Sequence, residues 1–278
     1  MTQVNTLEII GGDQIAKSSL ACAACMLKGS CFPIAMEMPN IAAFDAIVQR
    51  ARPLQKDEYV CREDQRFSTI YAVRSGAFKA YTTSESGEEQ ITGFYLPGEI
   101  FGIDGLSRDR YATSIVALET SSVCAIPFDR LQKLSAAVPA LQRHMFQLMS
   151  QTIVTEQEMI LQLGKYTAER RVAAFLERIS QHHAKRKLSA SKFRLPMSRT
   201  DIGCYLGLTV ETTSRIFSRF QKIGLLTLEN REVEIMSLDW LHELANGEPF
   251  RTAKSAFFPA APISAPSTSV RACVSARY

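Results

Sequence analysis

The sequence predicts an α+β chain with an N-terminal antiparallel β jelly-roll barrel, a long helix and a C-terminal winged helix-turn-helix domain. Short β-like runs separated by turn residues fill residues 54–138, and a heptad pattern follows over 139–165. A pair of capped helices with a hairpin lies within 166–246. At 278 residues the chain is long enough for about two domains, each with its own core.

The composition is that of an ordinary soluble globular protein, with 46% hydrophobic and 22% charged residues. No window holds the roughly 18 consecutive apolar residues of a membrane span. No charged start followed by an apolar core marks a signal peptide. We therefore expect a cytoplasmic protein with no membrane partner. In that compartment thiols stay reduced, and clustered cysteines bind metal or sense redox state more often than they form structural disulfides.

Residues 1–53 are expected to form a cysteine loop and a lead-in helix, with the helix over 40–48. Cys22, Cys25 and Cys31 are spaced C-x2-C-x5-C among small residues, and such close spacing gathers sulfurs at low entropic cost. Three ligands from one loop leave a coordination position open, which predicts a distant fourth ligand. The spacing suits iron and zinc equally, and a thiol–disulfide switch built from the same cysteines is a further alternative.

Residues 54–138 contain short β-like runs such as TIYAVRSGAFKAYTT, EEQITGFYLPGEIFG and SIVALETSSVCAIPF. Glycines mark the turns between the runs. These turn residues are Gly76, Gly87, Gly98 and Gly105. Repeated short strands with tight turns predict an antiparallel jelly-roll barrel.

Pro139 opens a helical pattern that runs to about Lys165. Its seam residues recur at alternating spacings of three and four, which is a heptad pattern. They are Phe146, Met149, Ile153, Glu156, Ile160 and Leu163. The helix would be about 40 Å long, more than one small domain usually covers. It either packs on its own barrel or forms a dimer seam, and we favour the dimer because helix-turn-helix modules usually read two half-sites as dimers.

Glu156 breaks the apolar character of this seam. In a parallel, two-fold related pair it approaches its own copy, and two desolvated like charges oppose association. Glu156 is therefore either a solvated charge at the edge of the seam or a built-in weakness that makes dimerisation conditional.

Residues 166–246 combine an amphipathic helix, two capped helices and a hairpin. Ser198 can cap the first helix of the pair, Asp201 favours its positive end and Gly207 allows a sharp turn. Thr209 caps the second helix, and LLTLENREVEIM has the pattern of a small hairpin. Together these features predict a helix-turn-helix followed by a wing.

The second capped helix carries the candidate DNA-reading residues. Near its start, Arg215 suits guanine and Glu211 can accept from cytosine N4, whereas the later Arg219 is better placed for a phosphate. Residues 165–222 carry 13 basic and 4 acidic residues, a balance of +9, while residues 1–164 carry 14 and 18, a balance of −4. This asymmetry fits a polyanion partner, although charge alone is also compatible with a solvated basic surface.

The last segment, 247–278, is rich in Ala, Ser and Pro and lacks periodicity. Such a composition buries too little apolar surface to form a core, so we expect a disordered tail. No nucleophile–base constellation and no phosphate-binding glycine loop occurs in the sequence, so an enzyme with catalytic residues is not expected.

These motifs resemble the FNR-type (fumarate and nitrate reduction) oxygen-sensing branch of the CRP-FNR transcription regulators. The resemblance covers about residues 20–245 and rests on CAACMLKGSCFPIAM, YAVRSGAFKAYT, GEEQITGFYLPGEIFGID, ALETSSVCAIPF and DIGCYLGLTVETTSRIFSRFQKIGLL. It implies a barrel like that of cyclic-nucleotide-binding domains. It also implies a [4Fe–4S] cluster whose ligands are Cys22, Cys25, Cys31 and Cys124.

The resemblance implies how such a cluster acts. The intact cluster favours a homodimer that binds double-stranded DNA when oxygen is absent and controls genes of anaerobic metabolism. Oxygen converts the cluster to a [2Fe–2S] form, and the dimer falls apart. Glu211, Ser214 and Arg215 match the residues that read a TTGAT half-site of a two-fold symmetric operator.

Further positions take their expected roles from the same resemblance. Ile153 and Ile160 match positions of the dimer helix. Glu156 falls where the family carries an acidic residue whose repulsion the cluster must overcome. The turns at Ser75 and Gly87 resemble surfaces that touch RNA polymerase.

The sequence also departs from the family pattern and leaves rival functions to weigh. Met26 and Ser30 lie where relatives differ and where side chains tune oxygen access. A cyclic-nucleotide-responsive regulator would need an Arg followed by a small hydroxyl residue, but Arg108 and Arg110 are followed by Asp and Tyr. Besides the cyclic-nucleotide regulator and the zinc or disulfide alternatives, a third rival function is that of an electron-transfer or catalytic iron–sulfur protein. Such a protein would have no affinity for DNA.

Overall fold

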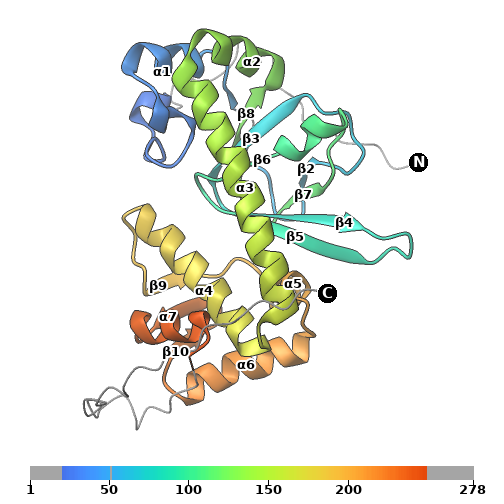
Figure 1. Cartoon of the computed structure of the whole chain (residues 1–278), viewed down its shortest axis with the longest axis vertical. Coiled ribbons are helices and arrows are strands. Elements are labelled where there is room, and N and C mark those ends of the chain that lie inside the picture. The colour runs from blue at the N-terminus through green and yellow to red at the C-terminus, as the bar shows by residue number, and fades with distance from the viewer. Residues whose placement is uncertain (1–20, 51, 249–278) are drawn as a thin grey trace, which may run out of the picture.

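The computed structural model describes residues 21–50 and 52–248, and Figure 1 shows how their elements are arranged. The cysteine loop and the barrel lie at one end, a long helix runs along the molecule, and the helix-turn-helix lies at the other end (Figure 1). Nearly all of the predicted tail over 247–278 falls outside the described residues. Among the helices of the described residues, none combines the length and apolar character needed to cross a membrane.

The N-terminal segment is built from two 3-10 turns and one helix. The turns are η1 (Cys22–Ala24) and η2 (Phe32–Ala35), and helix α1 spans Met38–Asp45. The sequence predicts this helix over 40–48. It begins earlier because a proline occupies its first turn, where the missing N–H costs no hydrogen bond.

Two four-stranded antiparallel sheets form the barrel, with strand orders β1-β8-β3-β6 and β2-β7-β4-β5. The strands are β1 (Gln49–Arg50), β2 (Tyr59–Cys61), β3 (Thr69–Ser75), β4 (Phe78–Thr83), β5 (Glu89–Tyr95), β6 (Ile100–Phe101), β7 (Ser114–Ala117) and β8 (Ser122–Pro127). The predicted jelly-roll is confirmed. Strand β1 precedes residue 54, where the sequence places the start of the barrel, because its two residues pair with β8.

Aromatic rings fill the barrel interior. The ring of Phe101 contacts three others at centroid distances between 5.2 and 5.6 Å. These neighbours are Tyr71, Phe78 and Tyr95. Rings at such distances interlock and bury large apolar areas. Helix α2 (Phe128–Ala137) packs against the same core through Leu131.

Helix α3 spans Pro139–Lys165, as the heptad pattern predicts. It starts against the barrel, where Leu141 is fully buried, and continues past the β4–β5 hairpin toward the C-terminal domain (Figure 1). Most of its side chains beyond the second turn are exposed or half-buried. The helix therefore joins the two domains and leaves one long face open.

The C-terminal domain contains four helices and a small sheet. The helices are α4 (Ala168–Lys185), α5 (Arg199–Leu206), α6 (Val210–Lys222) and α7 (Leu238–Asn246). The sheet has the order β10-β11-β9, with strands β9 (Lys192–Arg194), β10 (Leu226–Glu229) and β11 (Glu232–Ile235). The predicted helix-turn-helix and wing are confirmed, and β9 joins the wing as a third strand.

The C-terminal domain packs against the barrel sheet that contains β4 and β5. The ring of Phe94 lies 6.0 Å from Phe175 and 5.2 Å from Tyr205. Lys79 Nζ lies 3.2 Å from Asp201 Oδ1 at the edge of this contact. One apolar core therefore runs from the barrel into the C-terminal domain.

Candidate metal centre and DNA-reading helix

Four thiols line one cavity between the cysteine loop and the barrel. They belong to Cys22, Cys25, Cys31 and Cys124, the four cysteines expected as ligands. The space between them and their neighbours is about 390 Å³, including the part that opens to solvent. Its remaining walls are mainly apolar, with Phe44, Val48 and Ile126 among them. The fold thus brings together cysteines from distant parts of the sequence.

Successive tight turns carry the first three cysteines around this cavity. The Cys25 N–H donates to the Cys22 carbonyl over 3.3 Å, and the Lys28 N–H donates to the Cys25 carbonyl over 3.1 Å. Cys31 is the residue before the η2 turn, and the next residue, Phe32, is fully buried. The loop is therefore anchored to the core at the position of its third cysteine.

Strand β8 supplies Cys124. This residue lies opposite Arg50 of β1 and Ala72 of β3 in the antiparallel ladders. Alternate side chains of a strand share a face, which places Cys124 and Ile126 together on the cavity wall. The distant fourth thiol therefore comes from the sheet and not from a second loop.

Burial changes the acidity of these thiols. It raises the pKa of Cys31 to about 12. Burial and then the Asp45 carboxylate raise the pKa of Cys22. Burial also raises the pKa of Cys124, against a lowering influence from Arg50. These three thiols are therefore protonated at neutral pH without a bound group, and metal binding must release their protons.

The arrangement of the donors bears on which metal group they fit. Within residues 21–50 and 52–248, no three His, Cys, Asp or Glu side chains are close enough together to hold a single metal ion. The thiols instead surround a space. A zinc ion needs its ligands at one point, whereas an iron–sulfur cluster binds each cysteine through a different iron. Four thiols around an apolar cavity therefore fit a [4Fe–4S] cluster.

The two residues expected to tune oxygen access occupy different surroundings. Met26 follows Cys25, and its side chain is 94% exposed, so it points into solvent. Ser30 is half-buried and packs close to Gly98, where an added Cβ would come within 3.0 Å of the Ser30 Cβ. Ser30 therefore connects the loop to the barrel, and Met26 is not part of the cavity wall.

Phe32 joins the cysteine loop to helix α3. Its ring lies 5.5 Å from Phe44 of α1 and 6.1 Å from His144 of α3. Phe32 also borders a small apolar space that Met149 lines from the same helix. Packed interiors transmit displacement because they hold few voids. Phe32 is therefore a direct packing contact between the cysteine loop and the start of α3.

The predicted dimer seam is uncovered in the single chain. Ile153 and Ile160 are 56% and 71% exposed, and Glu156 is exposed between them. Met149 is half-buried at the barrel end of the seam. A contiguous stripe of large exposed apolar side chains marks an interaction surface.

Caps and one glycine determine the helix-turn-helix geometry. Ser198 Oγ accepts the Asp201 N–H over 3.0 Å, and Asp201 Oδ2 accepts the Ser198 N–H over 2.9 Å, which is a capping box. Gly207 ends α5 at φ 63°, a left-handed conformation that favours glycine. Thr209 Oγ1 then accepts the Thr212 N–H over 3.1 Å and starts α6.

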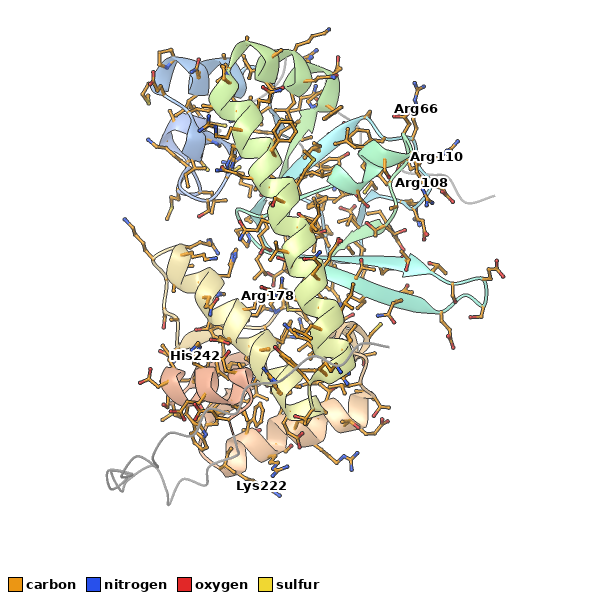
Figure 2. The ribbon with its side chains drawn as sticks, viewed as in Figure 1. Arg66, Arg108, Arg110, Arg178, Lys222 and His242 are labelled. Carbon is orange, nitrogen blue, oxygen red and sulfur yellow. The ribbon has the colours of Figure 1, made fainter. Side chains whose placement is uncertain are left out.

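Helix α6 buries one face and exposes the other. Its buried residues are Thr213, Ile216, Phe217 and Phe220. The residues expected to read bases are exposed, and they are Glu211, Ser214 and Arg215. Arg219 instead forms an ion pair with Glu169, with Nη1 and Oε1 3.0 Å apart. Lys222 extends from the end of the helix (Figure 2).

The two turns expected to touch RNA polymerase lie on the barrel. Ser75 ends β3, is exposed, and shares a 2.6 Å hydroxyl hydrogen bond with Ser122. Gly87 lies in the exposed turn between β4 and β5 at φ 85°. Both positions are accessible to a partner.

Two family models match the chain in the places where the two domains lie. The model of the cyclic nucleotide-binding domain matches residues 51–137, and that of the Crp-like helix-turn-helix domain matches residues 170–244. The solved structure of FixK2 from Bradyrhizobium japonicum is similar over 71% of this chain and 97% of that chain, with a TM-score of 0.66 and 31% identity.

Curated relatives match across both domains. Transcriptional activator protein FnrA of Stutzerimonas stutzeri is 47% identical over 84% of this chain and 95% of its own length. Transcriptional activator protein anr of Pseudomonas aeruginosa is 46% identical over 82% and 93%. The Anaerobic regulatory protein of Haemophilus influenzae is 43% identical over 81% and 88%. These names describe regulators and not enzymes, and the chain belongs to the FNR-type branch of the CRP-FNR transcription regulators.

Proposed function

We propose that the chain is an oxygen-responsive transcription regulator that binds a [4Fe–4S] cluster and, as an anaerobic dimer, binds a two-fold symmetric TTGAT-type operator. The observation that carries this proposal is the position of the four cysteines around one cavity. Relatives named as anaerobic regulatory proteins support oxygen as the signal. We extend to this chain the anaerobic conditions that their names indicate. The genes controlled are those of anaerobic metabolism, and the protein acts in the cytoplasm.

The proposed ligands are Cys22, Cys25, Cys31 and Cys124. When bound, the cluster supplies oxygen-sensitive iron–sulfur chemistry. The cysteines then tie the loop to strand β8, which restrains Cys31 and the buried ring of Phe32 beside it. Because Phe32 packs against His144, this restraint reaches the start of α3.

Association through α3 is the proposed output. The exposed apolar side chains of Ile153 and Ile160 favour pairing with a second copy, whereas Glu156 opposes it. The two effects nearly balance, so a small change at the barrel end of the helix decides the oligomeric state. Met149 belongs to the same seam and also borders the space beside Phe32.

DNA reading is assigned to α6. In a dimer two copies of this helix enter successive major grooves, and Glu211, Ser214 and Arg215 face the base edges. Arg219 is assigned to phosphate contact, for which it must exchange part of its ion pair with Glu169. The turns at Ser75 and Gly87 are proposed to contact RNA polymerase.

Two features argue against a cyclic nucleotide as the signal. Phe101 and its aromatic neighbours occupy the barrel interior. Arg108 and Arg110, the candidates for binding a nucleotide phosphate, are exposed on the outer edge of the barrel (Figure 2).

Spectroscopy under anaerobic conditions tests the proposal. Protein purified without oxygen is expected to show a broad visible absorption that disappears in air, together with loss of affinity for a symmetric operator. A colourless protein that contains zinc, or one whose affinity is the same with and without oxygen, would contradict it. Loss of affinity without any metal, reversed by a thiol reductant, would indicate a disulfide switch instead.

A further inference from the structure

Arg50 lies at the edge of the cysteine cavity beside two of the four thiols. Its Nη2 donates to Cys22 Sγ over 3.6 Å. In the β1–β8 ladder Arg50 is directly opposite Cys124, and such paired residues have Cβ atoms about 5 Å apart on the same face. The Arg50 side chain is 15% exposed. A largely buried guanidinium thus contacts a thiol of the loop from a strand position opposite the thiol of the sheet.

Asp45 fixes both Arg50 and the start of the loop. Its Oδ1 contacts Arg50 Nη2 and also accepts the backbone N–H of Cys22 over 3.0 Å. Asp45 is the last residue of α1, so this carboxylate is held by a helix and not by the loop itself. The pair therefore links α1, β1 and the first cysteine into one hydrogen-bonded unit.

Charge gives this unit a role beyond packing. Four thiolate ligands bring negative charge into a mainly apolar cavity, the cationic core of a cluster would offset only part of it, and buried charges are costly unless they are paired. Lys28, Arg50 and Arg74 are the cationic residues near the thiols, and Lys28 is exposed. Arg50 donates directly to a sulfur and, as an arginine, stays charged at every physiological pH.

We propose that Arg50, oriented by Asp45, is a positioning residue of the metal centre that donates a hydrogen bond to the Cys22 thiolate and holds a guanidinium close to Cys124. The inference rests on the proposed function because it concerns the same four-cysteine site. Partners that orient metal ligands commonly change metal affinity by about 10- to 100-fold when they are removed. Arg50 therefore sets how firmly the loop and the sheet hold the group together.

The test compares anaerobically purified full-length variants. Arg50→Gln is expected to lose iron to a ferrous chelator about 10-fold faster than the wild type under argon. Arg50→Lys, which keeps the charge, should recover part of this loss. Arg52→Gln is the matched control, because Arg52 pairs with Glu58 outside the cavity, and it should release iron at the wild-type rate.

The iron–thiolate stretching bands provide a second readout, since they respond to a hydrogen bond on sulfur and not to general loosening of the fold. A shift in Arg50→Gln that Arg50→Lys partly reverses is expected. Asp45→Asn should give a smaller increase in iron release, because it loosens Arg50 but also removes a negative charge beside Cys22, and it covers the case in which Arg50→Gln does not fold. If the rate of iron release and the iron–thiolate bands are unchanged in these variants, the role of Arg50 is wrong while the proposed function still stands. A wild-type protein without iron would overturn the proposed function together with it.

Discussion

The two functional ends of this molecule are built in opposite ways. The DNA-reading end is local: two adjacent helices, their caps and one glycine define it, and all lie within residues 198–222. The proposed metal end, the four-cysteine cavity with Asp45 and Arg50, is assembled from a loop, a helix end and two strands that are far apart in the sequence. The DNA-reading end packs into an apolar core that the C-terminal domain shares with the barrel sheet containing β4 and β5, whereas the other end holds groups that are costly to bury. In the proposed sensor, this difference would let the cysteine end change while the DNA-reading end stays folded.

Removing the fourth thiol should break the metal end and leave the DNA-reading end folded. Cys124→Ala is expected to abolish anaerobic operator binding, because the loop is then no longer tied to β8. Anaerobic fluorescence anisotropy with an operator duplex measures this loss. Cys61→Ala, which removes a buried thiol outside the cavity, should keep wild-type binding. Retained affinity in Cys124→Ala would place the fourth ligand elsewhere.

The reverse change should break the DNA-reading end and leave the metal end intact. Phe217 is 1% exposed on α6, and Phe217→Ala is expected to lower the free energy of unfolding of the C-terminal domain by about 3–5 kcal/mol. Urea unfolding followed by circular dichroism measures the change. The anaerobic visible spectrum should be unchanged, and a bleached variant would mean that the two ends are not separate.

Base reading and phosphate contact can be separated within α6. Arg215→Ala is expected to lower operator affinity by about 1–3 kcal/mol and to relax specificity at one base position. Arg219→Ala should weaken binding to all sequences and reduce the salt dependence by about one charge. Binding titrations over a range of salt concentrations, on operator and mutated operator, distinguish the two. Equal losses on both duplexes for Arg215→Ala would remove it from base reading.

A substitution of Glu156 tests whether α3, the helix that joins the two ends, controls dimerisation. Glu156→Ala is expected to dimerise and bind operator in air, because the like-charge repulsion across the seam is removed. Sedimentation velocity under air measures the oligomeric state. Glu158→Ala, an exposed acidic change outside the heptad positions of the same helix, is the control and should remain monomeric. If the Glu156→Ala protein stays monomeric in air, repulsion between the two Glu156 side chains is not what prevents dimerisation through α3.

The capping box gives the smallest expected effect. Burial alone would raise the pKa of Asp201, but hydrogen bonds from Ser198 and the nearby Lys79 ammonium hold it below its ordinary value. Its stabilising contribution is therefore present above about pH 4 and is lost as the pH falls through the lower folded-state pKa. Asp201→Asn should cost about 1 kcal/mol at neutral pH and flatten this acid dependence in thermal unfolding. If the loss of thermal stability at acidic pH is the same in Asp201→Asn as in the wild type, other carboxylates cause it.

The same contrast explains what the sequence could and could not predict. Ser198, Gly207 and Thr209 act on neighbouring residues, so the helix-turn-helix could be inferred from their spacing alone. The C-x2-C-x5-C loop predicts a missing ligand but does not locate it. Cys124 was identified through the family resemblance, because its approach to the loop depends on how β8 pairs in the barrel.

Arg50 was missed for the same physical reason. Nothing in its sequence neighbourhood distinguishes it from Arg52, and only the ladder with β8 and the contact with Asp45 place it at the thiols. The ion pair between Arg219 and Glu169 was also not foreseen, since it joins two helices. Strand β9 is three residues long and carries no periodic signal of its own.

In the proposed mechanism, the state of the metal end decides pairing along α3. Stepwise addition of oxygen to anaerobic protein, with visible absorption and sedimentation recorded on the same samples, tests it most directly. The absorption and the dimer fraction are expected to fall together, with the same dependence on oxygen concentration. Complete loss of the absorption while the dimer and its operator affinity persist would contradict it.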